Sequence, residues 1–489
     1  MQQPTTTAAS TKKTLTPTPS RLKDLLLILS FLTIIYLLFS SPRPQLSLTP
    51  RAAPSTSFLT TRRHIVFSIA SSSTSFIHRQ HYIRLWYNPT TTRAFAFLDR
   101  EAVDPTGNNT RSIMDPTLPR VIISKDTSSF PYTFKGGLKS AIRVARVVKE
   151  VVELNEPDVD WFVFGDDDTV FFVENLVTVL SKYDHNGWFY VGSNSESYDQ
   201  NVKNSFEMGF GGELGVGLSH EPGFHQVDMR GDLFGMLSAH PLSPLVSLHH
   251  LDAVNPIFPN MSKTQALEHL FNGVNVDPAR VLQQTVCYDP VHSLTVSVAW
   301  GYSVQVFEGN EFLPDLLIPQ RTFMPWRRGG NAEFTRFMFN IREYPKDPCK
   351  RPLIFFMESV TSGKNGIWSN YIRHDVADCN RGYAMKNLEL VRVLSHKLEP
   401  DIEQMKFPRR QCCDLSALFN GSMVISIRKC GWNLHALNTK SFKLAQYGYA
   451  MVGILDSVGN HSHSLLPAKV SSLKFDARMR KHDQENRRG

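Results

Sequence analysis

The sequence of 489 residues has no internal repeat, no strong excess of either charge and only one long apolar run without a charged residue. The single run excludes a membrane protein with several spans, and the charged fraction of only 20% excludes a coiled coil. The formal net charge is only +8, with 53 Lys and Arg against 45 Asp and Glu, and it gives no argument for nucleic-acid binding. Apolar residues make up 42% of the chain, which excludes a disordered polyelectrolyte and predicts a globular protein with a sizeable core.

Cysteine is absent from the first 286 residues. The six cysteines are Cys287, Cys349, Cys379, Cys412, Cys413 and Cys430. An even number predicts disulfides if the chain enters the secretory pathway. A metal site is the alternative, but no CxxC pair with a matching second pair is present. Four N-glycosylation sequons, at Asn108, Asn260, Asn420 and Asn460, agree with a secretory glycoprotein.

The apolar run Leu25–Phe39 carries no charge, and the two serines after it bring it close to the ~20 residues of a membrane-spanning helix. A cleaved signal peptide and a buried core helix are the alternatives. Pro42 and Arg43 stand where a cleavage site would need small residues. We therefore expect an uncleaved signal anchor at residues 25–41.

Basic residues give this anchor an expected orientation. Lys12, Lys13, Arg21 and Lys23 precede the run, and only Arg43 and Arg51 follow it closely. Because positive charge stays on the cytosolic side, the N-terminus is expected in the cytosol and the rest of the chain in the lumen. The prediction is a type II single-pass membrane protein.

Short apolar runs alternate with helical periods in the first half of the chain. Strands are expected at 64–71, 94–99, 120–126, 161–168 and 188–193, and helices at 77–87, 137–154 and 174–183. Such alternation is typical of an α/β domain with a mainly parallel sheet.

The pattern changes after Gly211. A short helix is expected at 261–271, opened by Ser262, and strand-like alternation follows at 294–308 and again at 353–359. These features predict a second, β-rich region.

The segment WFVFGDDDT places three consecutive carboxylates at the expected carboxyl end of a buried strand. Three adjacent negative charges repel one another unless a cation or hydrogen-bond donors compensate. Ligands bind at this end of the strands in α/β sheets, and Mg²⁺ and Mn²⁺ prefer carboxylate oxygens. Asp166, Asp167 and Asp168 therefore predict a divalent-metal site that faces a substrate phosphate. The alternative is a solvated acidic loop in which Thr169 caps the next helix.

Several longer stretches occur in a characteristic order: FSIASSS, VDWFVFGDDDTVFFVENL, WFYVGS, MGFGG, ELGVGLSHEPGFHQVDMRGDLFG, AHPLSPLVSLHHLD and DPCKRPLIFF. With these stretches the chain resembles the Fringe-related β-1,3-glycosyltransferases, in particular the large plant group of Fringe-like proteins. The resemblance implies a nucleotide-sugar-binding (Rossmann-like) domain of the A-type glycosyltransferase fold (GT-A). It also implies a UDP-sugar donor, Mn²⁺ or Mg²⁺ as cofactor, and an anchor in the Golgi membrane.

The resemblance and the patterns together divide the chain into six expected parts. These are a cytosolic tail (1–24), a transmembrane signal anchor (25–41), a Pro/Ser/Thr-rich stem (42–62), a Fringe-like GT-A domain (63–289), a β-rich region (290–430) and a basic tail (431–489).

The resemblance also implies roles for single residues. The acidic triplet matches the family's DxD motif, with Asp168 coordinating the metal and Asp166 and Asp167 on the nucleotide side. His225, in GFHQVD, corresponds to the first His of the family's FHSH region and is expected as a second metal ligand, with a structural role as the alternative. Independently of the resemblance, Arg79 follows the first expected strand and is a candidate to approach the diphosphate, with an ordinary surface arginine as the default alternative.

Other residues are given less specific roles. His249 and His250, at the end of an apolar run, are expected to pack or to lie in a loop. Gly209, Gly211 and Gly212 would let the backbone approach a sugar, although a turn explains them equally well.

The chain departs from the family at one place. In the family a longer stretch separates MGFGG from ELGV, and it holds an acidic segment resembling YGSDD with the expected catalytic base. Here Gly212 is followed directly by Glu213, so that segment is missing. An inverting transfer needs a carboxylate to take the proton of the acceptor hydroxyl. Glu213, Asp228 and Asp252 are present, but none matches the expected position, and no catalytic residue is assigned.

Three functions follow from these observations. The first is a Golgi enzyme that moves galactose or N-acetylglucosamine from UDP to a glycan with inversion, alone, as a homo-oligomer or in a complex with other Golgi transferases. The second is a non-catalytic lumenal protein that binds a UDP-sugar or a glycan, which the missing segment favours. The third is a metal-dependent phosphoesterase, which lacks a second set of His and Asp ligands. Turnover of a UDP-sugar distinguishes the first function from the second.

Overall fold

The computed structural model describes residues 60–101, 115–130, 140–203, 216–240, 243–326, 337–374, 379–399 and 411–430. The chain divides into a unit of residues 1–59 and a unit of residues 60–489, and every described residue belongs to the second. The expected cytosolic tail, membrane anchor and basic tail, with nearly all of the stem, lie outside the described residues. Within the ranges just given, no helix is both long and apolar enough to cross a membrane.

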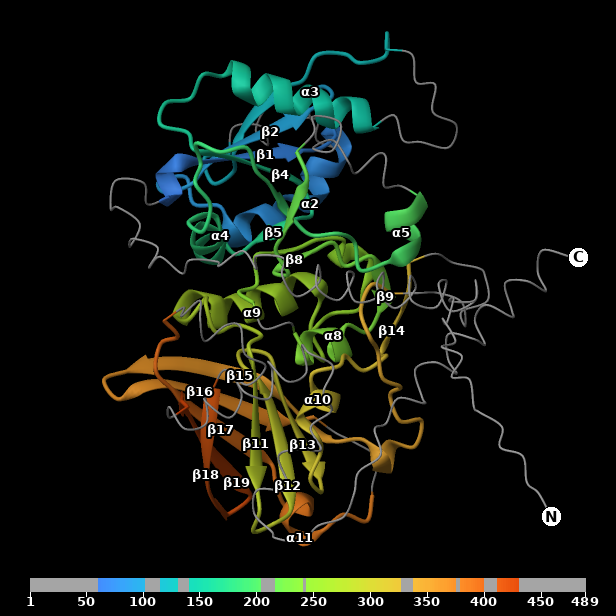
Figure 1. The fold of residues 1–489 in the computed structure, drawn as a ribbon, viewed down its shortest axis with the longest axis vertical. Coiled ribbons are helices and arrows are strands. Elements are labelled where there is room, and N and C mark those ends of the chain that lie inside the picture. Colours follow the sequence, from blue (N-terminus) through green and yellow to red (C-terminus); the bar gives the residue numbers. More distant parts are fainter. Residues whose placement is uncertain are drawn as a thin grey trace, which may run out of the picture. The chain divides into compact units, whose positions relative to one another are not determined.

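Four parallel strands form the N-terminal sheet in the order β3-β2-β1-β4 (Figure 1). The strands are β1 (Ile65–Ala70), β2 (Arg93–Leu98), β3 (Arg120–Ile123) and β4 (Trp161–Asp166), and the helices are η2 (Arg62–His64), α2 (Ser73–Trp86) and α3 (Ser140–Glu153). Helix α2 connects β1 to β2, and α3 lies between β3 and β4 in the chain. The alternation of strands and helices confirms the predicted α/β domain.

Both faces of this sheet are covered, which explains why its strands read as nearly continuous apolar runs. On β1, Val66 belongs to a small core with Val147 and Val151 of α3. Its neighbours Ile65 and Phe67 belong to the larger core on the side of α2. Because successive side chains of a strand point to opposite faces, one short strand contributes to two cores.

The fifth strand expected at 188–193 does not extend the parallel sheet. Only β6 (Tyr190–Gly192) is extended, and it pairs with β7 (Leu218–His220) in a separate two-stranded ribbon. The side chain of Trp188, next to β6, is 83% exposed, so the apolar residues of this segment do not form a buried strand. Strand β4 is therefore the edge of the main sheet.

Beyond β4 the chain contributes to a small mixed sheet in the order β5-β10-β8. Strand β5 (Val170–Phe171) is antiparallel to β10 (Ser247–Leu248), and β10 is parallel to β8 (Phe224–His225). A second short pair joins β9 (Met229–Gly231) to β14 (Phe323–Pro325). The helices of this part are α4 (Val173–Leu180), α5 (Tyr198–Lys203), α8 (Phe234–Ser238) and η3 (Leu251–Ala253).

Helix α9 (Lys263–Val276) begins where the sequence predicts. The Ser262 hydroxyl accepts a hydrogen bond from the Gln265 amide, and the Gln265 side chain accepts one from the Ser262 amide, which makes a capping box. The helix continues past the expected end at 271, because its buried face extends to Val274.

An eight-stranded sheet forms the C-terminal region, in the order β11-β12-β13-β15-β16-β17-β19-β18. Its strands are β11 (Gln284–Asp289), β12 (Leu294–Ala299), β13 (Ser303–Glu308), β15 (Leu353–Gly363), β16 (Gly366–Arg373), β17 (Leu390–Ser395), β18 (Gln411–Phe419) and β19 (Ser422–Lys429). Short helices α10 (Leu313–Leu316), η5 (Pro348–Lys350) and α11 (Tyr383–Lys386) lie between them. The predicted β-rich region is confirmed, but its sheet already begins at Gln284 instead of at residue 290.

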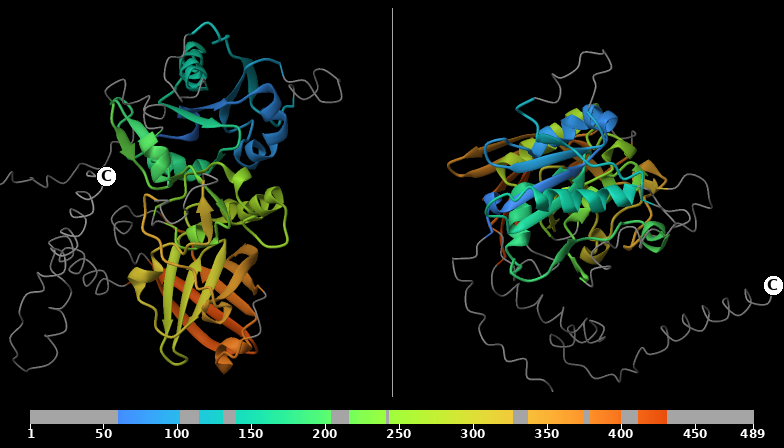
Figure 2. Two further views of the ribbon diagram at one scale, coloured as in Figure 1. Left: turned by 90° about the vertical axis from the view of Figure 1, so that its right-hand side faces the viewer. Right: turned by 90° about the horizontal axis from the view of Figure 1, so that it is seen from above.

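Three disulfides lie in the region of this sheet. The three pairs are Cys287–Cys413, Cys349–Cys379 and Cys412–Cys430. All six cysteines are paired, so the alternative of a cysteine metal site is wrong. The first pair joins β11 to β18, the two outer strands, which also contact each other directly. The sheet therefore curls until its edges meet (Figure 2).

One hydrophobic core runs from Ile65 in β1 to Ile427 in β19. Trp300 and Tyr302, at the turn between β12 and β13, are fully buried within it. The predicted boundary between residues 289 and 290 therefore falls inside the eight-stranded sheet, after β11, and does not divide the core.

Candidate metal centre

The acidic triplet lies in the turn that ends β4. The Thr169 amide donates to the Asp166 carbonyl at 3.0 Å, and the Asp166 amide donates to the Thr169 hydroxyl at 3.1 Å. Thr169 therefore closes this turn, and the next helix has Phe172 as its N-cap without a side-chain bond. Gly165 is required just before the turn, because a Cβ there would lie 2.8 Å from the ring of Phe171.

The three carboxylates have different surroundings. The side chain of Asp166 is 52% exposed, whereas those of Asp167 and Asp168 are almost fully buried. Asp167 accepts hydrogen bonds from the Ser71 hydroxyl and from Arg79 Nη1, the latter at 2.9 Å. Donors thus compensate the charge of Asp167, while Asp166 and Asp168 point toward a histidine.

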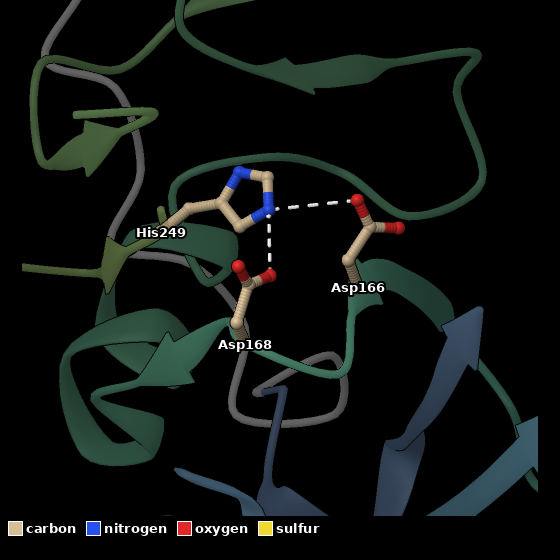
Figure 3. Close-up of side chains that lie close together, drawn as sticks. All are labelled: Asp166, Asp168 and His249. Carbon is tan, nitrogen blue, oxygen red and sulfur yellow. Dashed lines mark ion pairs between the residues drawn. The ribbon is translucent and has the colours of Figure 1, made fainter. Parts of the chain in front are cut away.

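That histidine is His249 (Figure 3). Its Nε2 lies 2.9 Å from Asp168 Oδ1 and 3.5 Å from Asp166 Oδ2. One ligand atom from each of the three residues lies within 4.8 Å of the others. Carboxylate oxygens with an imidazole nitrogen suit a divalent cation of the Mg²⁺ or Mn²⁺ type.

Strand pairing explains why these distant residues meet. In the ladder between β5 and β10, Leu248 is paired with Val170. His249 is the next residue after this pair on one strand, and the acidic turn immediately precedes it on the other. The sequence predicts packing or a loop position for His249 and not its place beside the triplet; the available signal was a histidine at a strand end that could face the triplet.

The structure places His225, the predicted ligand, elsewhere. Its ring is buried, with Nδ1 2.9 Å from Glu196 Oε1 and Nε2 2.8 Å from His240 Nε2. His225 is paired with Leu248 in the ladder between β8 and β10. Paired residues point to one face of a sheet and the next residue points to the other, so His225 and His249 face opposite sides. The structure brings Asp168 together with His249 and not with His225.

The chemistry of the cluster fits a cation. Asp168 Oδ1 and His249 Nε2 are buried, and neither has a hydrogen-bond partner of acceptable geometry although they are 2.9 Å apart. The other ring nitrogen, Nδ1 of His249, donates to Gln226 Oε1 at 2.8 Å. With its proton on Nδ1, His249 presents the Nε2 lone pair to the space between the carboxylates, as metal-binding histidines do.

Without a cation, a proton balances the charge of this cluster. Burial lowers the pKa of His249, but Asp166 and Asp168 outweigh burial and raise the pKa to about 9. Burial also disfavours the ionised form of Asp168, but His249 and Arg79 hold the pKa of this carboxyl below its usual value. At neutral pH the cation-free site therefore contains an imidazolium beside an ionised Asp168.

This proton makes cation binding depend on pH. Because a cation binds the neutral imidazole, binding well below pH 9 should release close to one proton from His249. Below about pH 8 the affinity for Mn²⁺ should rise about tenfold per pH unit, and it should level off near pH 9. Calorimetry in buffers of different ionisation enthalpy measures both quantities, and an affinity that does not change with pH would contradict the assignment.

Arg79 lies beside the cluster, on α2. Its Nη1 is 2.9 Å from Asp167, its Nη2 3.3 Å from Asp168 and its Nε 2.9 Å from Asp252. Burial alone would lower the pKa of Arg79, but the three carboxylates raise it above its usual value. The side chain is one-third exposed and fixed by three partners, so it is not an ordinary surface arginine. A role toward a diphosphate stays a prediction.

Of the three carboxylates considered and not assigned as the base, the structure describes two, Asp228 and Asp252. Asp252 accepts hydrogen bonds from Tyr82 and Arg79, and Asp228 is buried against Ser195 and His250. Gly209, Gly211, Gly212 and Glu213 lie outside the described residues, as does the junction where the base segment is missing.

Two family models match the chain. The family described as "Fringe-like" matches residues 125–225, and the family described as "Protein of unknown function, DUF604" matches residues 208–413. No curated protein matches the sequence. The acidic triplet lies in the first matched region and His249 in the second, so the cluster combines residues from both.

Proposed function

Because the chain belongs to a Fringe-related glycosyltransferase family, we propose that it transfers a hexose or N-acetylhexosamine, galactose or N-acetylglucosamine, from a UDP-sugar to a glycan acceptor. The transfer is inverting and depends on Mn²⁺. The family match implies a GT-A-like α/β domain with a β-rich region, in agreement with the two sheets. The observation that carries the proposal is the cluster of Asp166, Asp168 and His249 at the carboxyl end of β4.

The residues of the site have separate roles in this proposal. The buried Asp168 and the largely buried His249 would hold the cation, and the exposed Asp166 would reach it from the solvent side. A bound divalent cation supplies charge neutralisation for the leaving diphosphate. Arg79 adds a second positive charge at the same edge of the sheet, and Asp167 keeps that guanidinium in place.

One feature of the sequence favours a second candidate function. The direct junction of Gly212 and Glu213 omits the segment that holds the base in the family. A chain without a base could still bind a UDP-sugar and its cation, and would then act as a non-catalytic UDP-sugar or glycan-binding protein.

The test is UDP release by the full chain from a panel of UDP-sugars, with Mn²⁺ and with EDTA. The proposal predicts turnover with one donor and its loss in EDTA. Binding of UDP and Mn²⁺ by a folded chain without turnover would overturn the proposed transfer and favour the binding function. The measurement also reports whether another carboxylate replaces the missing base.

The proposed location is the Golgi membrane, with the described residues in the lumen. Three disulfides support an oxidising compartment. Two of the sequons lie in exposed turns with left-handed backbone, Asn260 with φ 57° and Asn420 with φ 48°. Asn420 and Gly421 form the turn between β18 and β19, where an attached glycan would not disturb the sheet.

Glycosylation therefore tests the location. Asn260→Gln and Asn420→Gln should each remove one glycan, seen as one step less on a gel that disappears after endoglycosidase treatment. Asn88→Gln is the matched control, because Asn88 is exposed but is followed by proline and forms no sequon. A chain that carries no glycan at either sequon would contradict the lumenal location.

A further inference from the structure

Three rings lie in a stack beside the candidate metal centre. The ring centroids of His249 and His250 are 3.8 Å apart with an interplanar angle of 26°. The centroids of His250 and Trp326 are 4.7 Å apart with an angle of 27°. We infer that this stack, together with Asp228, positions the ring of His249 for cation binding. The inference rests on the metal site of the proposed function.

Asp228 fixes the middle ring of the stack. His250 Nδ1 donates to Asp228 Oδ1 at 2.9 Å, and the other carboxylate oxygen accepts a hydrogen bond from the Ser195 hydroxyl. The side chain of Asp228 is only 6% exposed, so solvent does not compete for these bonds. A buried carboxylate with both oxygens bonded leaves the His250 ring little freedom to rotate.

One strand pair supplies both constraints on His250. In the ladder between β9 and β14, Met229 is paired with Pro325. Asp228 directly precedes Met229, and Trp326 directly follows Pro325, so the antiparallel ladder brings them to the same end. The hydrogen bond and the ring contact that hold His250 thus both come from the end of this ladder.

The backbone of His250 is also unusual. Its φ is 54°, in the left-handed region that is uncommon for residues other than glycine. In an extended strand the rings of His249 and His250 would point to opposite faces, whereas the left-handed residue allows the second ring to fold over the first. Such a conformation is strained for a residue other than glycine and persists only where the surroundings hold it.

His249 is consequently held in two directions. Gln226 binds Nδ1 at the edge of the ring, and His250 covers one face. Nε2 remains directed at Asp166 and Asp168. Partners of this kind typically contribute 10- to 100-fold to metal affinity, because they keep the ligand in its binding orientation.

The experiment measures Mn²⁺ affinity of the full chain and of Trp326→Leu. The variant is expected to bind about 10- to 100-fold more weakly, while its thermal midpoint in EDTA shows that it is folded. Trp326→Phe retains a ring and should recover most of the affinity. Trp368→Leu is the matched control, because Trp368 is a half-buried tryptophan on β16 that contacts Arg392 and no residue of the cluster.

A double variant shows whether Trp326 acts through His249. In a His249→Ala background, Trp326→Leu should cause no further loss of affinity. An equal loss in both backgrounds, or wild-type affinity of Trp326→Leu, would overturn the inference. If Trp326→Leu does not fold, His250→Gln removes the middle ring and must show the same loss. A wild-type chain that binds no Mn²⁺ contradicts the metal site itself and hence the proposed function, which is a different result from an unaffected Trp326→Leu.

Discussion

Asp168→Asn is expected to lower Mn²⁺-dependent UDP release by about 10³-fold. Asp168 is the buried carboxylate of the cluster, and its Oδ1 lies 2.9 Å from the nitrogen that would share the cation. The amide has nearly the same size but carries no negative charge, so the cation loses its most deeply placed anionic ligand. Initial rates of UDP release at saturating Mn²⁺ measure the effect.

Asp289→Asn is the control for this prediction. Asp289, at the end of β11, is also paired with a histidine, with its Oδ2 2.6 Å from His292 Nδ1, but neither residue belongs to the cluster. The control should release UDP at the wild-type rate. If Asp168→Asn retained more than about a tenth of the activity, the cluster would not be the centre of the reaction.

Gly223→Ala is expected to destabilise the fold by about 3–5 kcal/mol and to lower the thermal midpoint by roughly 5–10 °C. A Cβ at this position would lie 2.0 Å from the Pro244 carbonyl oxygen, which no rotamer change can relieve. The carbonyl of Gly223 also accepts hydrogen bonds from the amides of Val246 and Ser247. A shift of the backbone at residue 223 would therefore also move β10, which ends next to His249. Thermal unfolding monitored by circular dichroism checks the shift.

Gly217→Ala is the matched control for this substitution. A Cβ at Gly217 would have no atom within 4 Å, so the change should alter the free energy of unfolding by less than about 0.5 kcal/mol. Equal thermal midpoints for the two variants would show that the contact between Gly223 and Pro244 does not limit the fold.

The sequence predicts those parts of the fold that depend on local patterns. The apolar run of β1, the amphipathic period of α3 and the serine before α9 each determine an element from residues that are close in the chain. The acidic triplet is likewise visible because its members are consecutive and follow a strand. For these elements prediction and structure agree, because the residues that produce the sequence pattern are the same residues that form the element.

Which histidine faces the acidic triplet depends instead on the register of the paired strands. Strands β8, β10 and β5 have only two residues each, which is too short for any period to show which side chains share a face. Without their ladders, His225 and His249 are two histidines that each follow an apolar residue. The pairing of Leu248 with both Val170 and His225 decides that His249 faces the triplet.

The prediction of a buried strand at 188–193 was wrong for a related reason. Its apolar residues satisfy the pattern of a buried strand, but a strand is buried only if a neighbour covers it. Here the ribbon of β6 and β7 leaves Trp188 exposed. Whether a strand is buried depends on the tertiary arrangement around it, so the sequence of one segment does not determine its burial.

The central claim is that Asp166, Asp168 and His249 bind one divalent cation. Crystals of the full chain grown with Mn²⁺ and UDP, with diffraction data collected at the manganese absorption edge, locate the ion by its anomalous scattering. The account predicts one peak within about 2.5 Å of Asp168 Oδ1 and His249 Nε2. A peak beside His225 and Glu196, or no peak at the carboxyl end of β4, would contradict it.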